Sequence, residues 1–218
     1  MTGDLLLPGE RLHGLFDTMR AFAEATIDYQ RLLNTVAEHM ARLVGNGCVV
    51  ALLSEDEQSL IPSAVFFDDP CLTDDAQRVL GSGPIPLAGS ELGQQLIRQR
   101  QTILIQHGDV DALTAQLSAA DAAALKNAGM RSLLALPLEL RGRLIGVIAL
   151  LRLGTMCAAF TAEDEAVARN LAEHATLAIS NSQLLESQKR EIRERMLAQE
   201  RAERFESLIQ HSGEFIAM

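Results

Sequence analysis

The chain is poor in aromatic residues: they make up 4% of its 218 residues, with one tyrosine and no tryptophan. Proteins that bind single-stranded nucleic acid depend on aromatic side chains to stack the bases. Basic residues are also in the minority, with 19 Lys and Arg against 29 Asp and Glu, a formal net charge of −10. Such a charge repels phosphate backbones, and no basic stripe compensates for it. We therefore expect no nucleic-acid partner.

Cysteines are few and far apart, at Cys48, Cys71 and Cys157, without a CxxC pair. This usage fits a reducing compartment and provides no zinc signature. Long apolar runs are absent as well, since the longest, near residues 144–151, falls far below the about 18 residues that span a bilayer. The first residues lack the basic region and cleavage site of a signal peptide. We expect a cytoplasmic protein without a membrane partner.

The residues that are present predict helices at the two ends of the chain. Between Gly9 and Val44, apolar residues recur every three or four positions, with a change of phase near Asp28 that predicts a break. Gly45 and Asn46 then predict a left-handed C-cap. A capping box at residues 161–164 starts a helix expected from Glu163 to about His211, roughly 70 Å long. Its apolar face gives way to evenly charged residues after Leu185.

The middle of the chain predicts strands and short helices. Apolar runs at 48–54 and 60–67 predict one hairpin, and runs at 132–140 and 143–153 predict another that turns at Arg141 and Gly142. Pro137 predicts an irregularity inside its strand. A short strand is expected at 102–106. Short helices are expected at 73–80, at 90–100, and from a capping box at 118–121 to Gly129.

The stretch SLLALPLELRGRLIGVIALL, followed by FTAEDEAVARNLAEHATLAISNSQLL, carries a family pattern. A Pro-Leu strand, a Gly turn, an Ile-Gly-Val strand, a Phe-Thr-x-x-Asp cap and a helix ending in Ala-Ile-x-Asn resemble a GAF domain. The resemblance spans residues 28–185. It implies an α+β, GAF-like fold: a central antiparallel sheet with helices on both faces, flanked by long N- and C-terminal helices.

The resemblance also implies a domain plan typical of bacterial sensor histidine kinases. Residues 1–27 would form an N-terminal dimerisation helix, 28–185 the GAF domain, and 186–204 a signalling helix or coiled-coil linker. Residues 205–218 resemble the truncated start of a PAS domain, although a frayed helix tail is the alternative. The homodimer would form through the two end helices. Its predicted contacts are Leu12, Phe16, Met19, Leu171, Ala178, Leu185, Ile192 and Met196.

In GAF domains a small-molecule pocket lies under the middle elements. Here the resemblance implies a pocket lined by Phe66, Cys71, Ile105, His107, Met130 and Ser132, although these residues could instead fill a closed core. We do not expect haem, because His107 is a lone histidine. Bilin is disfavoured because Cys71 is followed by Leu72 and not by His, and cyclic nucleotides are disfavoured because their signature is absent. The ligand is left open.

Three functions fit these observations. The first is a non-enzymatic sensory or regulatory GAF module, which binds a small molecule or relays packing changes through a dimeric helix to a downstream PAS or kinase module. The second is a thiol-dependent methionine sulfoxide reductase of the same fold, which needs two thiols within reach of each other. The loop GSGPIP at 81–86 contains no cysteine for that chemistry. The third is a pure dimerisation scaffold.

Overall fold

The computed structural model describes residues 8–26, 28–69, 83–87, 95–106, 129–154 and 158–214. Six strands form one antiparallel sheet in the order β3-β2-β1-β6-β5-β4. The elements, in chain order, are α1 (Pro8–Ala25), α2 (Tyr29–Val44), β1 (Gly47–Leu53), β2 (Ser59–Phe67), β3 (Ile85–Pro86), the π-helical turn η1 (Gln95–Gln99), β4 (Ile103–Ile105), β5 (Met130–Leu140), β6 (Arg143–Leu153) and α7 (Ala162–Glu214).

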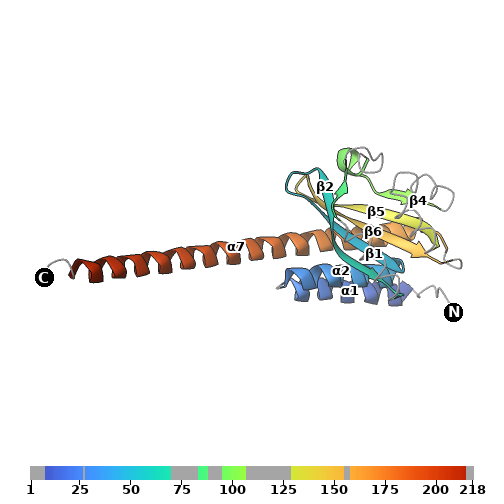
Figure 1. Ribbon diagram of the computed structural model, residues 1–218. Helices are drawn as coiled ribbons and strands as arrows, with labels where there is room; N and C mark the ends of the chain where they lie inside the picture. The colour runs from blue at the N-terminus through green and yellow to red at the C-terminus, as the bar shows by residue number, and fades with distance from the viewer. Residues whose placement is uncertain are drawn as a thin grey trace.

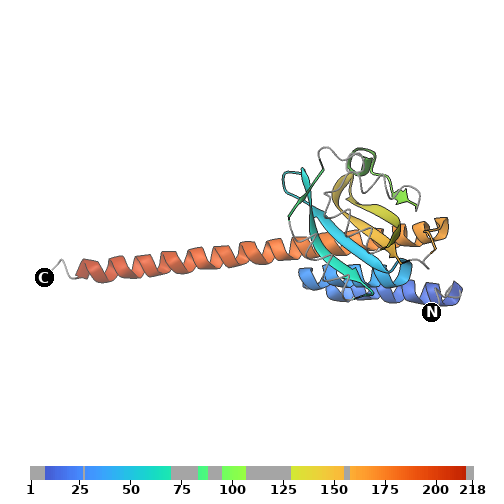
Figure 2. The same cartoon turned by 45° about the vertical axis from the view of Figure 1, so that its right-hand side comes forward.

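The three long helices lie together on one face of the sheet. Figures 1 and 2 show α1, α2 and the first part of α7 packed beneath the sheet, while the rest of α7 extends far beyond the domain. On the opposite face the described residues place η1, whose Leu96 packs against the sheet, while β4 is the edge strand beside β5. The predicted α+β class, with an antiparallel sheet and long helices from both ends of the chain, is confirmed.

The predicted break between the first two helices is confirmed at Asp28. Its extended backbone ends the continuity of the helices, and its side chain caps α2 by accepting a hydrogen bond from the backbone N–H of Arg31 at 3.0 Å. The predicted left-handed C-cap is wrong, because Gly45 has φ −125° and ψ −141°. A glycine is needed there for another reason: a Cβ would lie 2.7 Å from the carbonyl oxygen of Leu151.

Both hairpins are confirmed by their registers. Arg141 and Gly142 both have positive φ, at 51° and 79°, which makes the β5–β6 turn the type I′ turn that suits a two-residue hairpin. The irregularity expected at Pro137 occurs one residue later, because Pro137 still pairs with Val147 and the register shifts between Leu138 and Glu139.

The predicted short helices are only partly covered. Those at 73–80 and 118–129 lie outside the described residues except for Gly129. Of the helix predicted at 90–100, residues 95–99 are described, and they form a π-helical turn and not an α-helix.

Apolar side chains cover both faces of the sheet. The main core lies between the sheet and the helices, where Val50, Leu134 and Ile148 meet Met40 of α2 and Leu171 of α7. The other face carries two apolar clusters. One contains Val49, Phe67, Ile105, Met130, Leu151 and Leu153, and the other contains Ala51, Leu60, Leu87, Leu96, Ala135 and Val147. Among the described residues, no helix combines the length and apolar character needed to cross a bilayer.

Candidate functional site

Among the residues predicted to line a pocket, those that the structure describes fall on two different faces of the sheet. Ile105 and Met130 lie together on the face opposite the helices, in a cluster that contains Phe67. Phe66 packs instead against the helix-side core, with the guanidinium carbon of Arg42 5.3 Å from its ring centre. Successive strand residues point to opposite faces, so Phe67 takes the place predicted for Phe66.

Ser132 is also separated from Met130. The register shifts between these two residues, which reverses the alternation of faces and places Ser132 opposite Arg152, on the helix side. The Ser132 side chain is fully buried, and its hydroxyl has no hydrogen-bond partner among the described residues. Cys71 and His107, the other two predicted pocket residues, lie outside the described residues.

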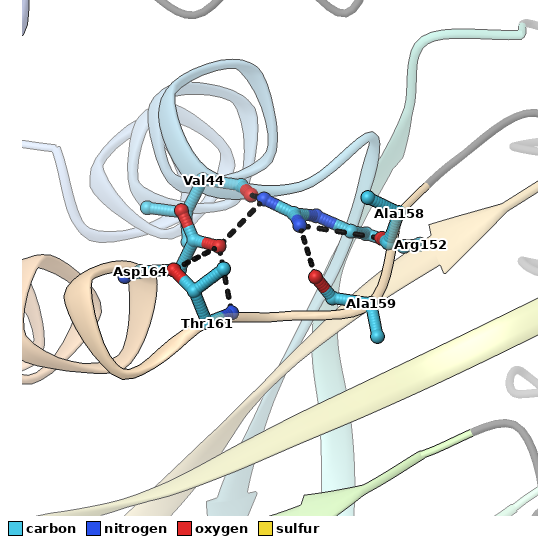
Figure 3. A network of polar contacts seen from close by, with 6 residues as sticks. All are labelled: Val44, Arg152, Ala158, Ala159, Thr161 and Asp164. Atoms are coloured by element: carbon cyan, nitrogen blue, oxygen red, sulfur yellow. Dashed lines mark hydrogen bonds and ion pairs between the residues drawn. The ribbon is translucent and has the colours of Figure 1, made fainter.

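A largely buried arginine, Arg152, forms the densest polar network that the structure describes. Arg152 belongs to β6, and Figure 3 shows its guanidinium between the end of α2 and the start of α7. It donates to the carbonyl oxygens of Val44 and Ala159, both at 2.9 Å, and of Ala158 at 3.3 Å. It also forms an ion pair with Asp164 at 3.0 Å. One side chain thus joins the sheet to two helices.

Asp164 is both the partner of Arg152 and the cap of α7. Its Oδ2 accepts hydrogen bonds from the backbone N–H and the hydroxyl of Thr161, while the Asp164 N–H donates to that hydroxyl at 3.2 Å. This is the capping box predicted from the sequence, with Asp in the position often held by Glu. Because Phe160 lies 4.5 Å beneath the Arg152 guanidinium, the charge is also covered by an aromatic ring. We call Arg152, Thr161 and Asp164 the helix anchor.

The neighbouring residue of β6 is fixed by Asn46. The Asn46 side-chain amide donates to the carbonyl oxygen of Leu153 and accepts from its N–H, both at 2.9 Å. A side chain here makes the pair of bonds that a neighbouring strand would make. The end of β6 and the start of α7 are therefore held firmly against the end of α2.

The part of α7 that packs on the domain ends at Gln183, which makes a different kind of contact from the helix anchor. The Nε2 of Gln183 donates to the hydroxyl of Tyr29, the first residue of α2, at 2.8 Å. Tyr29 is half-buried, and this burial raises the pKa of its phenol above the usual value of 10.0. From Gln183 to Arg201 every side chain of α7 is exposed, so this contact marks the point where the helix leaves the domain.

The residues predicted for the dimer interface divide into two groups. Leu171 is fully buried and Ala178 is 8% exposed, both within the core of one chain, so their assignment to an interface is wrong. The sevenfold spacing that suggested them continues a face that already packs on the sheet. Phe16, Leu185, Ile192 and Met196 are exposed, Met19 is half-buried, and the side chain of Leu12 lies outside the described residues.

Three exposed leucines on α7 were missed by the sequence analysis, of which Leu197 is 48% exposed and directly follows Met196. Leu177 is 51% exposed and Leu184 is 59% exposed. Leu177 and Leu184 each precede by one residue a position that was assigned to the interface. The sequence carried little signal for them, because Leu177 lies between Thr176 and Ala178 and Leu184 lies next to Leu185.

Cys48 is buried in the main core on β1. Burial raises the pKa of its thiol far above the ordinary value, because the apolar surroundings disfavour the thiolate. The thiolate is the form that attacks a sulfoxide or a disulfide, so Cys48 is not available for thiol chemistry. Cys71 and Cys157 lie outside the described residues.

The arrangement of the sheet and the helices matches a known family. Residues 28–179 match the family model for the GAF domain. That match covers well over half of the chain, and the chain belongs to the GAF domain family. No curated protein matches it.

Solved structures with this fold come from proteins of different kinds. The GAF domain of an Acinetobacter phosphoenolpyruvate-protein phosphotransferase aligns with a TM-score of 0.62 at 14% identity, covering 82% of this chain and 97% of that one. The Stigmatella aurantiaca phytochrome photosensory core module gives 0.62 at 15% identity, covering 88% and 41%. The free methionine-R-sulfoxide reductase of Neisseria meningitidis, in complex with its substrate, gives 0.56 at 20% identity, covering 81% and 92%. At these identities the similarity concerns the fold alone.

Proposed function

We propose that the chain is a non-enzymatic regulatory module of a cytoplasmic signal-transduction protein, and that α7 carries its state, as part of a homodimer, to a downstream PAS or kinase module. GAF domains commonly have sensory or regulatory roles in signalling proteins. The observation that carries the proposal is the continuity of α7, whose 53 residues run from the domain core into solvent.

The two parts of α7 have different surroundings. Between Ala168 and Ile179 its apolar face is buried in the main core, whereas its side chains from Gln183 to Arg201 are all exposed. The helix contains neither glycine nor proline between Ala162 and Ser212, so nothing in its sequence interrupts it. A shift or rotation of the buried part is therefore transmitted along the helix axis.

The exposed part of α7 supports dimerisation. It presents Leu184, Leu185, Ile192 and Met196, which are 40% to 61% exposed. An isolated helical extension is marginally stable in water, and a second copy would bury these side chains. Residues 186–204 also hold six basic and five acidic residues, close to neutrality in a chain of net charge −10. Two copies can therefore approach along this part of α7 with little repulsion.

The reductase alternative is less favoured on physical grounds. It requires a reactive thiolate and a second thiol nearby, and Cys48 is buried with a raised pKa. The fold similarity to a methionine sulfoxide reductase does not supply those thiols. A pure dimerisation scaffold would use the same exposed apolar side chains of α7. The following experiment distinguishes such a scaffold from a relay.

The experiment fuses the whole chain, at its C-terminus, to a dimeric histidine-kinase catalytic module and inserts one to four or seven alanines after Ser187. Each residue turns the helix by about 100°, so two alanines place the downstream module on the opposite face and seven nearly restore it. We expect kinase activity to vary with this period. Activity that is independent of insertion length would favour the scaffold. The same insertions in a fusion that lacks the GAF domain provide the control.

Dimerisation is tested separately by light scattering. We expect the mass of two chains at tens of micromolar. A monomeric mass at that concentration would contradict the dimeric relay.

A further inference from the structure

The domain holds α7 firmly at its start and weakly at its exit. At the start, Arg152 reaches three carbonyl oxygens and the carboxylate of Asp164. At the exit, the hydrogen bond between Gln183 and Tyr29 is the one side-chain bond that the described residues 176–183 make outside α7. Gln183 is exposed, so water competes for this bond.

Two serines whose hydroxyl oxygens are buried, Ser180 and Ser182, add to the weakness of the exit. The hydroxyls of Ser180 and Ser182 have no hydrogen-bond partner among the described residues, and Ser182 is only 1% exposed. Thr176, one turn earlier, shows the usual arrangement, because its hydroxyl donates to the carbonyl oxygen of Ala172 at 2.7 Å. A buried hydroxyl without a partner destabilises the arrangement that buries it. When residues 180–183 pack against the domain, the hydroxyls of Ser180 and Ser182 therefore remain without hydrogen bonds.

We propose that residues 180–183 of α7 form a movable joint, which detaches from the start of α2 by breaking the Gln183–Tyr29 contact while the helix anchor keeps the start of α7 in place. Detachment gives the Ser182 hydroxyl access to water. It also frees the exposed part of α7 to change its direction. This inference rests on the proposed relay, because it names the place where the relay moves.

The start of α2 is a suitable fixed point for such a joint. Asp28 caps the helix through the N–H of Arg31, and the Gln30 side chain donates to the carbonyl oxygen of Ser63 on β2 at 3.0 Å. Tyr29 is therefore held between two residues that are bonded to the domain. Its hydroxyl stays in place whether or not Gln183 is present, and movement occurs on the α7 side.

Tyr29 also provides a probe at the joint. It is the single tyrosine of a chain without tryptophan, so the intrinsic fluorescence excited near 280 nm arises from this side chain. Detachment of α7 uncovers the ring, which acrylamide then quenches more efficiently. The titratable and charged residues that line the same cleft are Asp28, Glu55, Glu186 and Arg190. The charges of these residues do not change when the pH is kept neutral and the salt concentration is held fixed.

The test uses two alanine variants with opposite expected effects and a matched control. Ser182→Ala removes the buried hydroxyl, Gln183→Ala removes the bond to Tyr29, and Ser187→Ala makes the same change at an exposed serine of the same helix. All three gain helix propensity, so the control measures that gain. Hydrogen exchange is followed in the whole chain for peptides covering 177–187 and 165–172, alongside acrylamide quenching of Tyr29.

We expect Ser182→Ala to slow exchange at 177–187 by about fivefold relative to Ser187→Ala, and Gln183→Ala to speed it by a similar factor. Exchange at 165–172 should not change, and quenching of Tyr29 should rise in Gln183→Ala. Equal exchange in Ser182→Ala and Ser187→Ala, or a Gln183→Ala effect that extends to 165–172, would overturn the joint. These measurements need no output module, so they can fail while the insertion experiment still supports a relay.

Discussion

Replacing Arg152 by methionine should destabilise the domain strongly, and the helix anchor supplies the reason. Methionine keeps an apolar stem but removes the charge and every donor. Asp164, whose side chain is 8% exposed, then loses its cationic partner. The carbonyl oxygen of Val44, at the end of α2, where helix carbonyls lack intrahelical donors, also loses its bond from the guanidinium.

The magnitude follows from the burial of the pair. Removing one partner of a buried ion pair costs about 3–5 kcal/mol, because the remaining charge stays buried without compensation. The Arg152 side chain is 18% exposed, and Asp164 keeps its bonds from Thr161. These two facts place the expected loss near the lower end, at about 3 kcal/mol. That is a large share of the about 5–15 kcal/mol that stabilises a typical domain.

The assay is urea unfolding followed by the fluorescence of Tyr29, which begins α2 of the domain. We expect the free energy of unfolding to fall while the m-value stays constant. Arg169→Met is the control, because it breaks a solvent-exposed ion pair with Glu165 on α7. It should lower the free energy of unfolding by no more than about 0.5 kcal/mol. Adding Asp164→Asn to Arg152→Met should recover part of the loss. A loss below about 1 kcal/mol in Arg152→Met would refute the reasoning.

Three further predictions concern other parts of the chain. Gly146→Ala should cost about 2 kcal/mol or more in urea unfolding, because its Cβ would lie 2.5 Å from the carbonyl oxygen of Ala51; a neutral effect would show that β1 can yield. The chain should not reduce methionine sulfoxide with a dithiol reductant, and turnover that Cys48→Ser abolishes would contradict the regulatory role. Stability should fall as pH rises above about 10, where the unfolded chain ionises Tyr29 and the folded chain does not; Tyr29→Phe should lessen this fall, and an identical pH profile would contradict it.

Much of the fold was predictable because its signals are local. The helical period, the Asp28 break, the Arg141–Gly142 turn and the capping box at Thr161 each depend on a few neighbouring residues. The C-cap at Gly45 was wrong because the constraint comes from a distant carbonyl oxygen, that of Leu151.

The candidate site was harder to predict because it depends on the faces of strands. Strands that are apolar on both sides carry no alternation that assigns a face, so Phe66 and Phe67 could not be distinguished. The register shift before Ser132 reverses the assignment again. Arg152 offered a weak signal, as a charged residue within an apolar strand, but its partners lie on two helices that no local pattern connects to it.

Hydrogen exchange along α7 tests the central claim most directly, because the relay requires one helix with a stable part and a weak part. The apolar face of residues 171–179 is buried in the core, so this part of α7 should exchange only through global unfolding, whereas residues from Ile192 to Arg201 should exchange much faster. Both regions belong to one uninterrupted helix, so each serves as the reference for the other. A steep rise in exchange rate beyond Gln183 is the predicted result. Uniformly slow exchange over the whole helix would contradict the relay and favour a rigid scaffold.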